Sequence, residues 1–216
     1  IGVSGGVFFV HWGSNTTLTV NDSVITNNRS REGGVLYAGS GNTVTFNNTE
    51  ISDNTATTTG GAFYMRERGT LNLIISTVSG NTSASSGGAG QVIENATVNV
   101  TNSTVTNNVS SSSTNGNAFF SSSTNPVTFV SSIIAGNRDA TATGQNDLAG
   151  GPFNDGGHNL IGNADGAMSG SLLTPQSSTL VGSTANPLDP LLGPLADNGG
   201  PTRTHASLFG SPAINA

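Results

Sequence analysis

The sequence predicts an all-β protein, a right-handed parallel β-helix with three strands per coil and about 27 residues per coil. Three markers recur together at this spacing: an asparagine that closes each coil, a pair of small residues that opens it, and a short alternating stretch between them. Composition alone does not place three markers in one register. A fixed period in this range is typical of solenoid proteins.

The closing asparagines form a row that we expect to stack at one corner of the coils. There each side-chain amide can bond the next one, and asparagine tolerates the left-handed backbone dihedrals of a turn. A ligand-binding role is the alternative for this row, and a structural role is favoured because repeated polar ladders serve packing in solenoids. The row consists of Asn28, Asn54, Asn81, Asn108 and Asn137, at steps of 26, 27, 27 and 29 residues.

The coil that opens at Gly60-Gly61 shows how each repeat is built. The glycines lead into a short apolar strand, and Thr70–Leu73 then alternates strictly between polar and apolar residues. This alternation predicts a second strand with its leucines inside and Thr70 and Asn72 outside. A third short strand ends at Asn81. No six-residue repeat of the left-handed type is present.

Equivalent residues of stacked coils should form ladders spaced roughly 4.8 Å apart along the axis. Three apolar rows result, and they predict a narrow continuous core. These rows are Leu18, Val44, Leu71, Val98 and Val127; Val20, Phe46, Leu73, Val100 and Phe129; and Ile25, Ile51, Val78, Val105 and Ile134.

The outward positions of the alternating strand predict a flat, uncharged surface that is the candidate contact face. Such a threonine array is also typical of ice-binding surfaces, while β-branched polar residues suit any exposed strand. The face comprises Thr17, Thr19, Thr43, Thr45, Thr70, Asn72, Thr97, Asn99 and Thr128.

Composition excludes several classes of protein. The 216 residues carry a formal net charge of −6, and the six basic residues are all arginines that form no stripe, so we expect no nucleic-acid partner. There is no cysteine for disulfides or metal ligation, and no apolar run of the roughly 20 residues that a membrane span needs. The chain opens at Ile1 in coil register without a signal peptide, so we expect a processed or trimmed segment.

The chain is expected to form one domain in two parts. Residues 1–144 hold five regular coils, and residues 145–216 hold irregular coils and a wrapped Pro/Gly-rich segment. His158–Gly162 indicates a sixth coil with a long insertion. Four prolines between residues 187 and 201 argue against a central strand there, and residues 212–215 are a candidate final strand.

The residues of this C-terminal part carry a family resemblance. The run from Asn186 to Ala206, the ending Ser211–Ala216 and the stretch His158–Gly162 resemble the signature of choice-of-anchor Q domain proteins, and the coils are similar to polymorphic outer-membrane protein repeats. The resemblance covers nearly the whole chain. It implies a secreted prokaryotic surface protein with a right-handed β-helix, and it supplies no catalytic residue.

A polysaccharide-acting enzyme would need clustered carboxylates. The acidic residues are scattered, apart from Glu67 and Glu94, one coil apart in a turn. Asp155 and His158 share a Gly-rich loop, and a turn with a hydrogen-bonded histidine is the favoured interpretation.

His11 and Trp12 could offer a stacking platform for a sugar, although lone aromatic residues usually pack against other side chains. Asp189 and Asp197 could bind calcium, but an Asx turn is simpler, and we predict no catalytic residue, cofactor or metal.

These observations favour an extracellular, non-enzymatic structural or adhesive protein of the cell surface. Its expected partners are surface glycans and further copies of itself, joined head to tail into a filament because the first coil has no cap. The alternatives are a polysaccharide-acting β-helix enzyme and an ice-binding module that uses the outward threonine rows.

Overall fold

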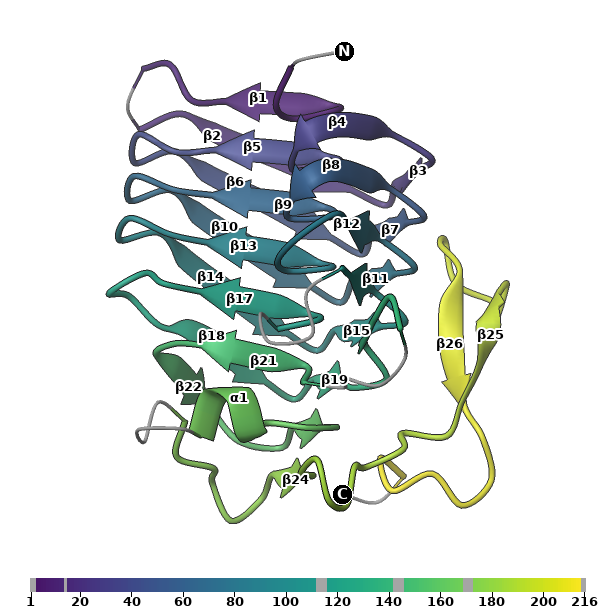
Figure 1. The fold of residues 1–216 in the computed structure, drawn as a ribbon. Coiled ribbons are helices and arrows are strands. Elements are labelled where there is room, and N and C mark those ends of the chain that lie inside the picture. Colours follow the sequence, from purple (N-terminus) through teal and green to yellow (C-terminus); the bar gives the residue numbers. More distant parts are fainter. Residues whose placement is uncertain (1–2, 14, 112–115, 142–145, 169–172, 215–216) are drawn as a thin grey trace.

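In the computed structural model, which describes residues 3–13, 15–111, 116–141, 146–168 and 173–214, the chain winds into a stack of coils that forms a parallel β-solenoid (Figure 1). The spacing between coils, about 27 residues, confirms the predicted fold class. Leu71 pairs with Val44 on one side and with Val98 on the other, as the register of the sequence markers predicts.

Four parallel sheets, here called A to D, form the walls of the stack. Sheet A contains β1 (Phe8–Val10), β5 (Leu36–Ala38), β9 (Phe63–Met65), β13 (Gly90–Val92), β17 (Phe119–Ser121) and β21 (Leu148–Gly150). Sheet B contains β2 (Thr17–Asn21), β6 (Thr43–Asn47), β10 (Thr70–Ile74), β14 (Thr97–Thr101), β18 (Val127–Val130) and β22 (Phe153–Asp155).

Sheets C and D complete the cross-section. Sheet C contains β3 (Val24–Thr26), β7 (Glu50–Ser52), β11 (Thr77–Ser79), β15 (Thr104–Thr106), β19 (Ile133–Ile134), β23 (Leu160–Ile161) and β24 (Leu180–Val181). Sheet D contains β4 (Arg29–Glu32), β8 (Thr55–Thr59), β12 (Thr82–Ser83), β16 (Val109–Ser110) and β20 (Arg138–Asp139). Sheet D therefore adds a fourth, short strand to the three that the alternation of each coil predicts.

The core runs along the axis as three apolar rows. Leu71, Val98 and Phe46 are fully buried, and the row from Ile25 to Ile134 is buried throughout. Leu18 and Val20 of the first coil are only partly buried and pack against this cluster. The alternation of the sequence therefore predicts the inward residues correctly.

The Gly-Gly marker has a steric cause at the corner between sheets D and A. Gly60 has a φ of +66°, which a side chain would strain. At Gly61 an added Cβ would lie 1.9 Å from the carbonyl oxygen of Gly88 in the next coil, so backbone fills the space that a side chain would occupy. Coils stack closely here where both positions are glycine, and Asn117 shows that the second position can carry a side chain in the fifth coil.

The C-terminal third of the chain first adds to the stack of coils and then departs from it. A sixth coil supplies β21, β22 and β23, and β24 adds a further strand to sheet C. The insertion between β23 and β24 contains the short helix α1 (Asp165–Met168). Ala167 of this helix and Ala164 just before it are buried in the core cluster. This helix covers one end of the core.

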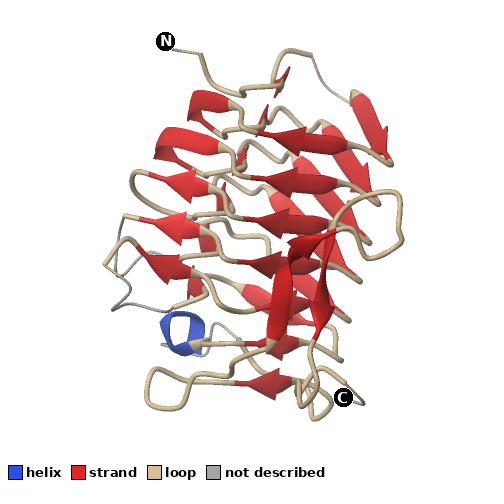
Figure 2. Cartoon of the chain, turned by 90° about the vertical axis from the view of Figure 1, so that its right-hand side faces the viewer, coloured by secondary structure: helices blue, strands red, loops and turns tan. Residues whose placement is uncertain are grey.

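The Pro-rich segment forms a hairpin of β25 (Leu192–Ala196) and β26 (Thr204–Ser207) that folds back along sheet C (Figures 1 and 2). Pro194 lies where the pairing shifts between Leu192 and Leu195, consistent with the exclusion of proline from central strands. The predicted final strand over residues 212–215 is wrong for its described residues, because Ser211–Ile214 close a turn through the Ile214 N–H and the Ser211 carbonyl, 3.1 Å apart. Asn215 lies outside the described residues.

Candidate functional site

The outward face of sheet B is the candidate contact face, and the structure brings its predicted residues together. Thr43, Thr70 and Thr97 are register partners, and Thr17 joins them at the first coil. The second row is equally in register, and its members are Thr19, Thr45, Asn72, Asn99 and Thr128. All nine side chains are exposed or half-buried, so they form one continuous surface.

The same face has a third row that the sequence analysis missed. Asn21, Asn47, Ile74, Thr101 and Val130 pair in register at its far edge. This row could have been found from the fifth residue of each strand. Its residue type varies more between coils than that of the threonine rows. Across the described strands of sheet B, every outward position is uncharged.

Hydrogen bonds along the rows hold the amide side chains of this face in place. Asn99 Nδ2 donates to Asn72 Oδ1 at 2.9 Å, and Asn72 Nδ2 donates to Thr45 Oγ1 at 3.2 Å. Adjacent rungs are separated by roughly 4.8 Å, and outward residues of one strand by about 6.6 Å. The face is therefore a preorganised grid of hydroxyl and amide groups on a rigid support.

The asparagine row is a continuous ladder, as predicted. Each Nδ2 donates to the Oδ1 of the next coil, at 2.9 Å from Asn54 to Asn81 and at 2.9 Å from Asn81 to Asn108. The backbone N–H of Asn54 donates to that same Asn81 oxygen at 3.0 Å. The side-chain amides of the buried asparagines all make hydrogen bonds within the protein, which supports a structural role for the ladder.

Asp147 ends this ladder, and the sequence analysis did not identify it. Its Oδ1 accepts from the backbone N–H and the Nδ2 of Asn137, and its Oδ2 accepts from the N–H of Asn163 at 2.8 Å. Burial raises the pKa of Asp147 to about 7, although these hydrogen bonds act in the opposite direction and lower the pKa. The aligned amides present their donor ends to this carboxyl group, in the way that a helix N-terminus favours an anion.

A second polar row follows the corner between sheets B and C. The side-chain oxygens of Ser76, Ser103 and Ser132 each accept the backbone N–H of the equivalent residue one coil earlier, at 3.0 to 3.1 Å. These residues lie five positions before each ladder asparagine, but serine is too common in this sequence for that spacing to stand out. The row satisfies backbone groups of the turns at this corner.

The pair Glu67 and Glu94 lies at the corner between sheets A and B, as expected, and Arg66 occupies both carboxylates. Arg66 makes two hydrogen bonds to Glu94, at 3.0 and 3.1 Å, and its Nη2 lies 3.0 Å from Glu67 Oε1. A hydrogen bond to the Tyr37 hydroxyl raises the pKa of Arg66 further. A permanently charged guanidinium keeps the two carboxylates from acting as a free acid and base pair.

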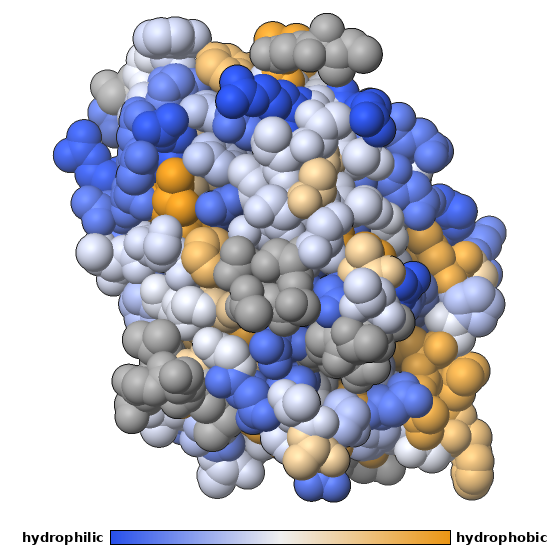
Figure 3. All heavy atoms as spheres, viewed as in Figure 1, coloured by the Kyte–Doolittle hydropathy of each residue, from blue (hydrophilic) through white to orange (hydrophobic). Residues whose placement is uncertain are grey.

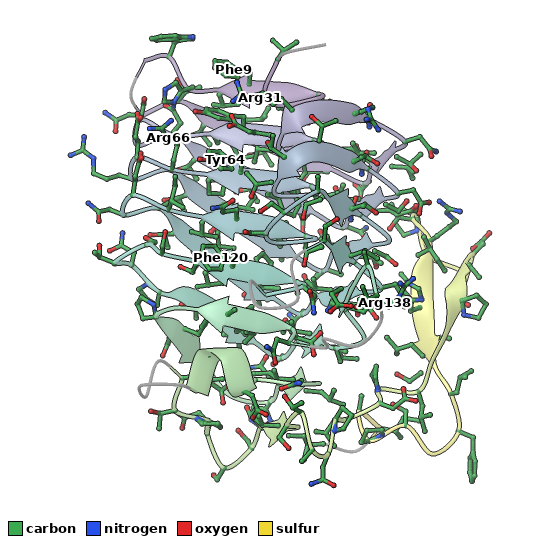
Figure 4. The ribbon with its side chains drawn as sticks, in the orientation of Figure 1. Phe9, Arg31, Tyr64, Arg66, Phe120 and Arg138 are labelled. Carbon is green, nitrogen blue, oxygen red and sulfur yellow. The ribbon has the colours of Figure 1, made fainter. Side chains whose placement is uncertain are left out.

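A row of aromatic side chains lies on the outward face of sheet A beside this cluster, and Figure 4 labels Phe9 and Tyr64 of this row together with Arg66. Phe9 stacks on Tyr37 with ring centroids 5.0 Å apart, and Tyr37 stacks on Tyr64 at 5.2 Å. Because these rings cover each other's faces, the row is structural. His11 lies against the Tyr37 ring and 3.7 Å from Glu67, whereas Trp12 is 81% exposed.

The side chains of Asp155 and His158, both described in the structure, make no hydrogen bond to each other. The Asp155 carboxylate accepts hydrogen bonds from the Gly157 N–H, the Thr179 hydroxyl, the Asn159 amide and the Gln176 N–H, at 2.6 to 2.9 Å. Burial raises the pKa of Asp155, but these bonds outweigh it and lower the value below the usual range. His158 has an exposed side chain and a φ of +57° in a turn.

The two aspartates considered as calcium ligands, Asp189 and Asp197, accept hydrogen bonds from nearby backbone N–H groups. Asp197 accepts the Gly199 N–H at 2.9 Å, and Asp189 accepts the Leu191 N–H at 2.8 Å, as in Asx turns. Within the described residues, no group of three or more histidine or acidic side chains could hold a metal ion.

The hairpin covers the outer face of sheet C, which the sequence analysis did not foresee. Glu50 points outward from β7, yet it is 0% exposed because Arg203 lies over it with Nε 2.9 Å from Glu50 Oε2. His205 Nε2 lies 2.9 Å from the Ser79 hydroxyl, and its Nδ1 lies 2.7 Å from the Gly193 carbonyl. Burial raises the pKa of Glu50, but the hydrogen bonds from Arg203 and Ser52 and the charge of Arg203 lower it below its usual value.

Searches against family models, curated proteins and solved structures found no match for this chain. The resemblance to choice-of-anchor Q domain proteins therefore stays a prediction. No helix in the described residues is long and apolar enough to cross a membrane.

Proposed function

We propose that this protein is an extracellular, non-enzymatic adhesive rod whose sheet B face binds neutral polysaccharides. The observation that carries the proposal is the uncharged threonine and asparagine grid, in register over five coils. Hydroxyl and amide groups exchange hydrogen bonds with sugar hydroxyls without the desolvation cost of charged groups.

The spacing of the grid supports an extended polymer as the ligand. Rungs repeat at roughly 4.8 Å, close to the ring-to-ring repeat of an extended chain of pyranose sugars. A glycan lying along the axis would meet the same set of hydroxyl and amide groups at each sugar. Many weak contacts on a rigid surface then add up without ordering flexible side chains first.

The pairing of three carboxylates supports a non-enzymatic role, and Asp147, whose pKa is raised to about 7, is buried and accepts hydrogen bonds from Asn137 and Asn163. Glu50 is paired with Arg203, Glu94 with Arg66, and Asp155 accepts four hydrogen bonds. A general acid or base needs a proton that it can gain or lose near the reacting bond.

The test is co-sedimentation of the protein with insoluble neutral polysaccharides, and with acidic ones for comparison. We expect retention on neutral polymers that persists at high salt, because no charge takes part. Release of sugars from the pelleted polymer would contradict the non-enzymatic proposal, and retention only on acidic polymers would contradict the proposed ligand.

Ice binding is the second candidate, and the unbroken Thr17 to Thr97 row favours it. In the next row Asn72 and Asn99 are hydrogen-bonded to their neighbours, which interrupts the threonine grid. Thermal hysteresis of the dissolved protein distinguishes the two, since a polysaccharide-binding face produces none.

Head-to-tail association into a filament also stays a prediction. In the described residues β1 to β4 each lie at the edge of a sheet, and such edges offer unpaired backbone groups. Helix α1 covers the core at the opposite end, so a joint there would have to form around it. Light scattering at increasing protein concentration tests this, and a strictly monomeric species would contradict it.

A further inference from the structure

Sheet D carries arginine side chains on its outer surface, away from the contact face. Arg29 and Arg31 of β4 and Arg138 of β20 are exposed, whereas Ser30 and Asp139, the residues that follow Arg29 and Arg138, are buried. The strands therefore alternate, with the arginines outside. In Figure 4, Arg31 lies near the N-terminal end of the stack and Arg138 lies several coils further along it.

Within the described residues, none of these three guanidinium groups makes an ion pair, although the chain has 12 acidic residues and 6 basic ones. The acidic residues of the same strands do not neutralise them. Glu32 is half-buried and its carboxylate accepts the Ser4 hydroxyl at 2.8 Å, and Asp139 is 1% exposed. An acidic protein thus presents permanent positive charges on one narrow face.

Two of these arginines end one ladder of outward side chains. The register runs through Arg29, Thr55, Thr82, Val109 and Arg138, one residue per coil. At roughly 4.8 Å per rung, the Cα atoms of Arg29 and Arg138 are separated by about 19 Å. The three residues between them are half-buried and uncharged. The sequence alone does not show this row, because its two arginines lie far apart in the chain.

This ladder is complementary to a polymer with sparse, regularly spaced negative charges. Sugars of an extended pyranose chain repeat at close to the rung spacing, so sugars four units apart would meet the two arginines. A sugar carboxylate can form a bidentate pair with a guanidinium group, and the threonine hydroxyls between can bond sugar hydroxyls. Duplex DNA carries one charge per roughly 1.7 Å of its axis, which is far denser than the charge of this row.

We propose that the outer face of sheet D is a second binding surface, whose ligand is an acidic polysaccharide that contains uronate sugars. Arg29 and Arg138 bind carboxylates four sugars apart, and Arg31 adds a further cation beside Arg29 in β4. This surface is independent of the contact face, because sheets B and D are separate walls of the stack and the two ligands differ in charge. A rod with both surfaces joins a neutral polymer to an acidic one.

The test compares immobilised polygalacturonate with its fully methyl-esterified form, which has the same backbone without the charges. We use the Thr45→Tyr variant as the parent, so that the contact face does not contribute. Polygalacturonate should retain this parent at low ionic strength and release it in high salt, and the esterified polymer should not retain it. Equal retention on the two polymers, or stronger retention on immobilised DNA, would overturn the proposal.

Variants locate the surface. Arg29→Gln and Arg138→Gln should each weaken binding to polygalacturonate at least tenfold, and Thr82→Glu, which places a carboxylate in the middle of the ladder, should abolish it. Arg68→Gln is the matched control, because it removes the same charge from an exposed arginine at the corner between sheets A and B.

Arg68→Gln should bind polygalacturonate as the parent does, and circular dichroism should show that every variant is folded. An equal loss of binding in Arg68→Gln and Arg29→Gln would show that only net charge matters and would contradict a site on sheet D. Made in the wild type, the same substitutions should leave retention on neutral polymers unchanged. Failure of the acidic ligand is therefore distinguishable from failure of the neutral ligand proposed for the contact face.

Discussion

Ile75 shows how a single residue can depart from the pattern of its row. It has a φ of +50° at the corner between sheets B and C, and its side chain is 57% exposed. The equivalent residues in the neighbouring coils are Asn48 and Asn102, which adopt the same left-handed conformation. Asparagine tolerates that conformation, whereas a β-branched side chain is strained in it.

Replacement of Ile75 by asparagine should therefore stabilise the protein by about 1 kcal/mol. The reciprocal change Asn102→Ile, at the same position of the next coil, should destabilise it by a similar amount. Urea unfolding midpoints measure both. Equal loss of stability in the two variants would show that exposure or packing, and not the backbone conformation, controls this position.

A single residue, Asp147, should make the stability of the folded protein depend on pH. Its pKa is raised from 3.8 to about 7 in the folded protein. The protonated form is thus favoured by folding, and the stability that this carboxyl group contributes is present in full below pH 3.8 and is lost as the pH rises through 7.

The variant Asp147→Asn should remove this component, because an amide does not titrate and its oxygen can still accept from Asn137. At pH 4 the wild type should have a higher melting temperature than the variant. This difference should shrink or reverse by pH 8. A difference that is constant across this range would contradict a raised pKa for Asp147.

At the scale of structural elements, the asparagine ladder stabilises a whole corner of the stack. Asn81→Ala would leave the Asn54 backbone N–H and side-chain amide without their acceptor inside a buried site. We expect a loss of about 3 kcal/mol from unsatisfied buried groups. Asn28→Ala, at the half-buried end of the same ladder, keeps the backbone N–H and removes the side-chain donor Nδ2, so it should cost about 1 kcal/mol. Similar losses at both positions, measured by urea unfolding, would contradict the account.

The hairpin is the element whose attachment depends most on charge. The pKa of Glu50 is lowered below its usual value, so the stability from its pairing with Arg203 is present above pH 4.5 and is lost as the pH falls through the folded pKa. We expect Arg203→Ala to increase hydrogen exchange in β25 and β26 at neutral pH, while sheets A and B keep their protection. Wild type should show the same local increase in acid. Uniform loss of protection over all sheets would contradict local detachment.

At the scale of the molecule, the sequence predicts the part of the fold that repeats. Gly60-Gly61, the Thr70–Leu73 alternation and Asn81 each have a local cause in a turn, a pleat or a ladder, and each recurs with the coil, so register and facing follow from them. The outward rows of the contact face could be located for the same reason.

The features that the sequence does not reveal lack a repeated signal. The strands of sheet D carry few apolar residues, so no alternation of polar and apolar residues marks them. The pairing of Glu50 with Arg203 joins residues 153 positions apart, and neither neighbourhood indicates the other. Polar rows such as Ser76 to Ser132 are hidden because serine and threonine occur throughout the chain.

Large exposed hydrophobic side chains occur in the first coil, as at Trp12, at Ile75 and in the C-terminal segment. Figure 3 shows a mainly hydrophilic face over sheets A and D, with hydrophobic surface at the hairpin and its connections. Leu191, Leu208 and Phe209 are the exposed residues there. The contact face lies on another side of the stack, so the binding proposed for it would not involve these residues.

The most direct test of the central claim, binding through the sheet B face, compares two bulky substitutions in polysaccharide co-sedimentation. Thr45→Tyr places a ring in the middle of the grid, and Thr82→Tyr places the same ring on the half-buried outward side of sheet D. If the sheet B face binds the polysaccharide, Thr45→Tyr should weaken binding at least tenfold, about 1.4 kcal/mol, while Thr82→Tyr should bind as wild type does. Equal binding by the two variants, both folded, would contradict it.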